Sequence, residues 1–94
     1  CCRGDLSSYR VVVGRSTKPT GPFLDRDGKD MAAGGGTPVA FNNAIYNASG
    51  HNSAYTIEGK DWYVSHAYER DGGNSRLILR EMGWDEDGWP VVEL

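Results

Sequence analysis

The sequence lacks three patterns that would decide its class at once. No window of its 94 residues repeats apolar side chains at helical spacing, so we expect little helix. No stretch approaches about 18 consecutive apolar residues, so no membrane-spanning segment is expected. There is no block of lysine and arginine, and the formal net charge is −3. A nucleic-acid partner is therefore not expected.

Cysteine is also scarce, and its placement disfavours a disulfide. The two cysteines, Cys1 and Cys2, are adjacent in the chain. Neighbouring Cα atoms lie about 3.8 Å apart, whereas disulfides usually join Cα atoms roughly 4.4–6.8 Å apart. A bond between them would be strained, so we expect two buried thiols and draw no conclusion about the redox compartment.

Glycine, in contrast, is abundant. The chain has 13 glycines, with 38% hydrophobic and 24% charged residues, which is typical of a globular protein rich in turns. Its length allows one domain at most and only a small core. We therefore treat residues 1–94 as a single unit.

Short apolar alternations separated by turn residues predict an all-β fold. Strands are expected at residues 9–16, 51–57, 62–68 and 75–82, with short runs at 38–41 and 89–92 and a loop at 42–50. The Asp87-Gly88 pair is typical of a hairpin turn. Strands about ten residues apart with such turns indicate antiparallel sheet. Pattern alone leaves sandwich, barrel and propeller open.

A set of short motifs, in a fixed order along the chain, narrows this choice. They are Cys1-Cys2-Arg3-Gly4, Ser8-Tyr9, Val13-Gly14-Arg15-Ser16, Thr20-Gly21-Pro22-Phe23, Gly34-Gly35-Gly36-Thr37, Gly50-His51-Asn52, His66-Ala67-Tyr68 and residues 84–92. The chain thereby resembles the endo-α-1,5-L-arabinanases of glycoside hydrolase family 43. It departs from the family pattern at Ala48-Ser49, where Gly-Pro usually precedes the Gly-His-Asn motif.

The resemblance implies a five-bladed β-propeller built from four-stranded antiparallel blades. A blade takes about 40–50 residues, so this chain is expected to supply about two blades, as a C-terminal fragment of the propeller. An open arc of blades leaves strand edges unpaired. The expected partner is the rest of its own propeller or a second copy.

The resemblance also implies a glycoside hydrolase that cleaves internal α-1,5-L-arabinofuranosidic bonds of arabinan with inversion and without a redox cofactor. Inverting hydrolysis needs two carboxyl groups beside the scissile bond. In the family these belong to segments before the Cys-Cys motif, so we assign no catalytic residue to this chain. The alternatives are a family 43 enzyme acting on xylan or arabinoxylan, and a non-catalytic carbohydrate-binding or remnant fragment. By analogy, the location is extracellular or periplasmic.

Two kinds of site residue follow from the resemblance, a metal ligand and substrate contacts. The histidine matching His51 binds a metal, taken as calcium, near the propeller axis, although calcium prefers oxygen ligands. The alternative for His51 is a histidine that is hydrogen-bonded in a buried channel. Asn52, Arg15, Cys1 and Cys2 are expected to contact substrate or support its cleft. The alternative for Arg15 is an ion pair at a strand end.

Other polar motifs have simpler interpretations. The carboxylates of Asp25, Asp27 and Asp30, and those of residues 85–87, are expected to lie in solvated turns. Asn47-Ala48-Ser49 fits the pattern of a glycosylation acceptor. The tryptophans are expected to pack between blades, with stacking on sugars as the alternative.

Overall fold

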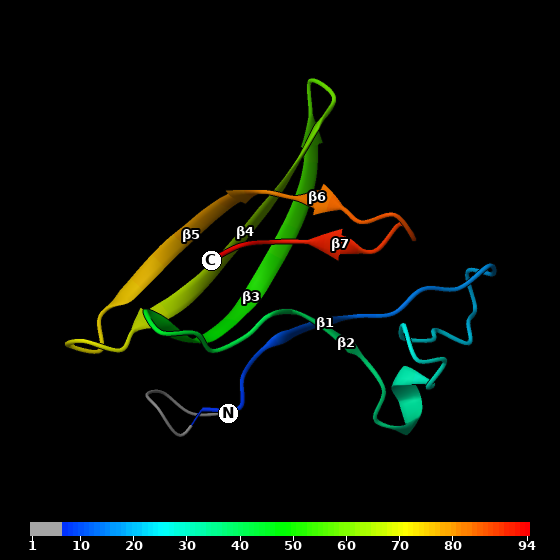
Figure 1. The fold of residues 1–94 in the computed structure, drawn as a ribbon, viewed down its shortest axis with the longest axis horizontal. Helices are drawn as coiled ribbons and strands as arrows, with labels where there is room; N and C mark the ends of the chain where they lie inside the picture. The colour runs from blue at the N-terminus through cyan, green and yellow to red at the C-terminus, as the bar shows by residue number, and fades with distance from the viewer. Residues whose placement is uncertain (1–6) are drawn as a thin grey trace.

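A computed structural model of the chain describes residues 7–94, and its regular structure is almost entirely strand (Figure 1). The elements are β1 (Val11–Val13), η1 (Met31–Ala33), β2 (Thr37–Ala40), β3 (Tyr46–Ile57), β4 (Lys60–Glu69), β5 (Ser75–Glu81), β6 (Gly83–Trp84) and β7 (Pro90–Val91). Every strand pairing is antiparallel. The only helix in this part of the chain is one 3₁₀ turn, η1. The predicted all-β class is confirmed.

Residues 7–40 form an N-terminal unit around β1 and β2. The register joins Val11 to Ala40 and Val13 to Thr37. Beyond β1 the chain makes further antiparallel bridges, from Arg15 to Leu24 and from Leu24 to Asp30. This unit is therefore held together largely by single bridges and turns.

Residues 46–94 form a C-terminal unit with longer strands. β3, β4 and β5 pair in that order. β6 continues the course of β5 after Met82 and pairs with β7 (Figure 1). Four successive antiparallel segments result, β3, β4, β5 with β6, and β7, as expected for a propeller blade.

The predicted loop at 42–50 is wrong over its second half, because β3 already begins at Tyr46. The pairing of β3 with β4 shifts register between Asn47 and Gly50 and again between Gly50 and Ser53. These bulges allow the consecutive residues 47–50 to be buried together. Such a segment shows no alternation, so the strand pattern is absent from the sequence.

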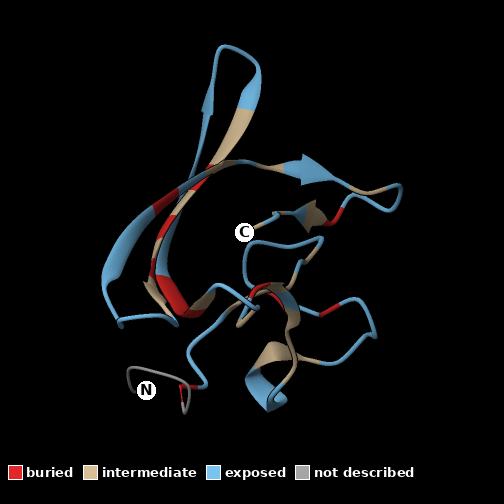
Figure 2. Cartoon of the chain, turned by 60° about the vertical axis from the view of Figure 1, so that its left-hand side comes forward, coloured by how far each residue is buried: buried red, intermediate tan, exposed pale blue. Residues whose placement is uncertain are grey.

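The core lies between the two units. Tyr63, Ala67 and Ile78 of the C-terminal unit are buried and cluster with Ala40 of β2. Five partly buried side chains complete the cluster, and they are Val11, Tyr46, Met82, Val92 and Leu94. Figure 2 shows the buried positions concentrated along β4 and the neighbouring part of β3. One face of the β3–β4–β5 sheet therefore joins the units.

The opposite face of this sheet is open. On β5, Ile78 is 1% exposed, whereas Leu77 is 79% exposed and Leu79 is 54% exposed. Tyr55 and Ile57 of β3 are also exposed. Their hairpin with β4 projects beyond the body of the molecule (Figure 1). The described part of the chain has no helix with the length and apolarity needed to cross a membrane.

Candidate functional site

The Gly50-His51 segment is the most irregular part of β3. Gly50 pairs with His66, and no pairing is made again until Ser53. His51 has φ of 50°, in the left-handed region that residues other than glycine seldom occupy. Bulges next to functional sites re-aim side chains. The predicted metal ligand thus lies at a backbone distortion and is exposed to solvent.

The surroundings of His51 are aromatic. The His66 ring lies 6.3 Å from the His51 ring, 5.8 Å from the Tyr9 ring and 5.7 Å from the Tyr68 ring, between centroids. The Tyr9 hydroxyl accepts a hydrogen bond of 2.9 Å from the His51 backbone N–H. The imidazole of His51 makes no hydrogen bond within residues 7–94, which leaves it available to a ligand.

The described residues around His51 offer few ligands for a calcium ion. Among the described residues, no three histidine, cysteine or acidic side chains gather as a metal site. Calcium usually takes six to eight oxygen ligands. His51 fits the role of one protein ligand in a largely hydrated shell, with the other ligands coming from water or from outside residues 7–94.

Asn52 lies in a different environment from His51. It lines an apolar groove of about 230 Å³ between the two units, together with β1, Val39, Tyr63 and Trp84. Here the structure separates two predicted site residues that are adjacent in sequence. The predicted substrate contacts Cys1 and Cys2 lie outside the described residues.

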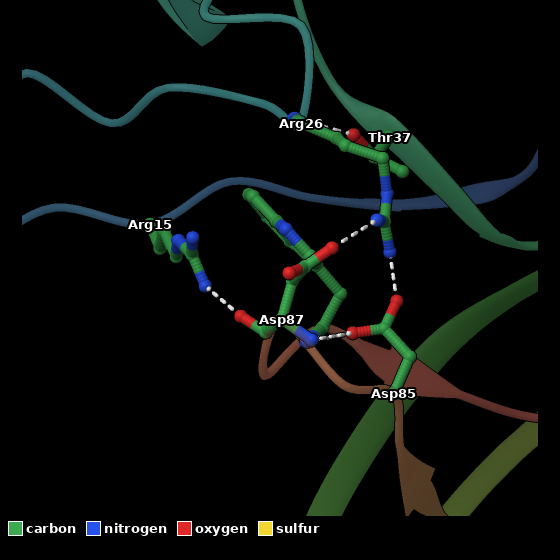
Figure 3. Close-up of polar contacts among 6 residues, drawn as sticks. Arg15, Arg26, Thr37, Asp85 and Asp87 are labelled. Carbon is green, nitrogen blue, oxygen red and sulfur yellow. Dashed lines mark hydrogen bonds and ion pairs between the residues drawn. The ribbon is translucent and has the colours of Figure 1, made fainter.

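Arg15 lies in a contact between the units (Figure 3). Its Nη1 donates to the Asp87 carbonyl oxygen at 2.7 Å. Its guanidinium carbon lies 4.2 Å from the centroid of the Trp89 ring. The alternative expected for Arg15 was an ion pair, but its bond is to a carbonyl and its second contact is a cation–π contact.

Arg26 completes this contact. Its guanidinium forms ion pairs with the carboxylates of Asp85 and Asp87, and it lies 5.5 Å from the Trp89 ring centroid. Arg15, Arg26, Asp85, Asp87 and Trp89 together are called the clasp below. Trp89 is buried, and both guanidinium groups lie near its ring at the contact between the units. Four of the clasp residues, Arg15, Arg26, Asp87 and Trp89, also line an open pocket of about 750 Å³.

The acidic turns have structural roles. Asp25 Oδ1 accepts the backbone N–H groups of Asp27 and Lys29, and Oδ2 accepts that of Gly36. These bonds, with Gly36 and Lys29 first, hold the pKa of Asp25 below its ordinary value. The expectation of a solvated carboxylate is wrong for Asp25, which is buried, although residues 26–29 of its turn are exposed.

A second turn with the same hydrogen-bond pattern is built around Asp85. Its Oδ1 accepts the backbone N–H groups of Asp87 and Trp89, as Asp25 does with Asp27 and Lys29 in the first turn. The bond from Trp89 is the main cause of a lowered pKa at Asp85, with Arg26 contributing. The Asp-x-Asp-Gly turn therefore occurs twice, once in each unit.

The glycosylation pattern is not accessible. Asn47 is 1% exposed and Ser49 is fully buried. An enzyme could not reach this amide in the folded chain. Both residues lie in the bulged part of β3.

The family model of glycosyl hydrolases family 43 matches residues 2–90. The chain belongs to glycoside hydrolase family 43. Among curated relatives, the extracellular exo-α-(1→5)-L-arabinofuranosidase ArbA of Cellvibrio japonicus is 48% identical over 99% of this chain. The extracellular endo-α-(1→5)-L-arabinanase 1 of Bacillus subtilis is 37% identical over 96%. The chain spans 27% of each of these relatives.

Solved structures of family 43 members agree. An exo-1,5-α-L-arabinanase from a bovine ruminal metagenomic library has a TM-score of 0.90, with 48% identity over 100% of this chain and 31% of its own. An α-L-arabinanase of Cellvibrio cellulosa complexed with arabinohexaose has a TM-score of 0.90, with 47% identity over 99% of this chain and 30% of its own. The expected propeller fold is confirmed, with this chain supplying a part of it.

The sequence motif singles out His51, but it does not indicate which side chains surround His51. The contact from Tyr9 spans 42 positions in sequence, and the pair of Arg26 with Asp85 spans 59. No local pattern marks such contacts. The repeated Asp-x-Asp-Gly string, in contrast, is visible in the sequence and could have predicted two equivalent turns.

Proposed function

We propose that the protein containing this chain hydrolyses α-1,5-L-arabinofuranosidic bonds of arabinan. The observation that carries this proposal is the 48% identity over nearly the whole chain to a relative named for this linkage. A second relative, at 37%, is named for the same linkage. Both are named extracellular, so the same location is proposed here.

Two modes of cleavage remain open. The resemblance in the sequence motifs favours cleavage of internal bonds, and several relatives at 36–38% identity are named endo-acting. Two relatives at 48% identity are named exo-acting, which favours cleavage from chain ends as the second candidate. Viscosity of a linear arabinan separates the modes, because internal cleavage lowers it before many reducing ends appear.

The proposed reaction needs an acid and a base, and we assign neither role to this chain. Inverting hydrolysis requires one carboxylic acid to protonate the leaving oxygen and one carboxylate to activate water. The carboxylates of Asp25 and Asp85 accept backbone N–H groups in their own turns. They are therefore occupied as structural acceptors, and we place the catalytic pair in other segments of the parent protein.

His51 is proposed to bind calcium as a single imidazole ligand. The imidazole is exposed, lacks a hydrogen-bond partner within residues 7–94 and is held at a bulge of β3. A bound cation would favour the ionised form of nearby carboxylates. Titration calorimetry of the full-length protein with Ca²⁺ tests this role, and His51→Ala should weaken binding at least tenfold. Unchanged affinity in that variant would refute it.

The substrate-binding roles of Arg15, Asn52, Cys1 and Cys2 remain predictions. Arg15 is partly engaged in the clasp, and Asn52 faces the groove between units. Saturation kinetics on linear arabinan test them, since loss of a sugar contact raises KM. A non-catalytic binding protein would instead retain arabinan without releasing any reducing ends.

Substrate class is tested with the full-length protein on linear arabinan, xylan and arabinoxylan. Release of arabinose or its oligosaccharides from linear arabinan alone is the expected result. Release from xylan but not from arabinan would favour the alternative family 43 activity. The exposed face of the β3–β4–β5 sheet is proposed to pack against another part of the same propeller in this protein.

A further inference from the structure

Tyr9 connects the two units at the position of His51. It precedes β1 and belongs to the N-terminal unit, yet its hydroxyl accepts the backbone N–H of His51 in β3 at 2.9 Å. Because the pairing of β3 with β4 is interrupted between Gly50 and Ser53, no β4 carbonyl is paired with that N–H. Tyr9 therefore supplies the acceptor that the interrupted ladder does not.

The Tyr9 ring also explains the glycine at position 50. A methyl group added at Gly50 would overlap the Tyr9 ring. Gly50 is not in the left-handed region, since the positive-φ residues of this segment are Ala48 and His51. The need for glycine thus comes from the close approach of the Tyr9 ring and not from backbone conformation.

Tyr9 and His51 share a third contact, the His66 ring. Tyr9 lies 5.8 Å from it and His51 lies 6.3 Å from it, with tilted and edge-on geometry. These separations are typical of packed aromatic rings. His51 is itself exposed, so its direction depends on its backbone and on these ring neighbours more than on burial.

We propose that Tyr9 is a positioning residue that holds the Gly50-His51 bulge and thereby aims the His51 imidazole. This proposal rests on the metal role proposed for His51, but its backbone part can be measured separately. The Tyr9 hydroxyl fixes the N–H of His51, and the Tyr9 ring fixes the Cα of Gly50. The metal ligand of one unit is therefore oriented by a side chain of the other.

The test uses the full-length protein and Tyr9→Phe, which keeps the ring and removes the acceptor. Amide hydrogen exchange of His51 should speed up about fivefold, as expected for loss of one hydrogen bond. Calcium affinity should weaken about tenfold, as for other groups that orient a metal ligand. Tyr55→Phe is the matched control, because Tyr55 is exposed and lies on β3, the strand that contains His51. Neither the exchange of the His51 amide nor calcium affinity should change in this variant.

A second pair of variants tests the ring. Gly50→Ala should displace Tyr9 and weaken calcium binding, and adding Tyr9→Ala should relieve the overlap, so that the two effects are not additive. Strict additivity would overturn the packing part of the proposal. Circular dichroism of each variant confirms that the fold is retained.

The outcomes separate the two proposals. If Tyr9→Phe changes neither the exchange of His51 nor calcium affinity, the Tyr9 proposal fails while the metal role stands. If His51→Ala leaves calcium binding unchanged, the metal role fails and with it the aiming of a ligand by Tyr9. Faster exchange in Tyr9→Phe with unchanged affinity also overturns the proposal, because the bulge would then be held without consequence for the ligand.

Discussion

At Asp25 one carboxylate organises a whole turn. It accepts three backbone N–H groups, two from its own turn and one from Gly36. Charged acceptors bind such groups more strongly than neutral ones. A buried side chain that was expected to be solvated thus fixes the path from the bridge at Leu24 to the start of β2.

We predict that Asp25→Asn lowers the stability of the full-length protein at neutral pH. The folded pKa of Asp25 lies below its ordinary value, so its contribution is fully present above the unfolded pKa and is lost as pH falls through the folded pKa. Acid unfolding followed by fluorescence should show a shallower pH dependence in the variant. Asp27→Asn is the control, and an equal effect in both variants would contradict the role of Asp25.

At Arg15 the structure favours a contact between units. Its bond to the Asp87 carbonyl and its position over Trp89 are worth about 1 kcal/mol together at an exposed site. We predict that Arg15→Ala lowers the unfolding free energy by that amount in urea, whereas Arg10→Ala does not. A raised KM with unchanged stability would instead indicate a sugar contact.

The strands differ in how plainly the sequence predicts them. β4 and β5 were predicted because their side chains alternate between a buried and an exposed face, as Ile78 and Leu77 show. β3 was predicted only from His51 onward, because its bulged first half buries consecutive residues. The position of His51 could be predicted from its motif, but the Tyr9 contact could not, since it joins residues far apart in sequence.

At the scale of β5, we predict that Ile78→Ala destabilises the full-length protein by about 2–5 kcal/mol, as for other large-to-small changes in a core. Ile78 is nearly fully buried and belongs to the cluster that joins the units. Equilibrium denaturation measures the change. A loss below about 0.5 kcal/mol, the range of surface substitutions, would contradict this description of the core.

The whole molecule has one closed face and one open face on its main sheet. The closed face packs on the N-terminal unit, while the open face carries Leu77 and Leu79. Large exposed apolar patches mark interaction sites or cause aggregation. Since the chain spans less than a third of its relatives, the remaining part of the propeller is the expected cover for this face.

We predict that the double variant Leu77→Ser/Leu79→Ser behaves differently in the isolated chain and in the full-length protein. In the isolated 94-residue chain the change should reduce self-association in sedimentation velocity, because the patch is exposed. In the full-length protein it should lower the melting temperature, because the patch is then covered. An unchanged melting temperature in the full-length double variant would contradict the proposed packing.

We propose that this chain is part of an inverting hydrolase of α-1,5-linked arabinan, and proton NMR of the early reaction tests this proposal. The full-length protein is mixed with linear arabinan, and the anomeric protons are followed before mutarotation. We expect the α-linkage signals to decrease and β-configured reducing ends to appear first. Intact linkages, or reducing ends that appear first in the α configuration, would contradict it.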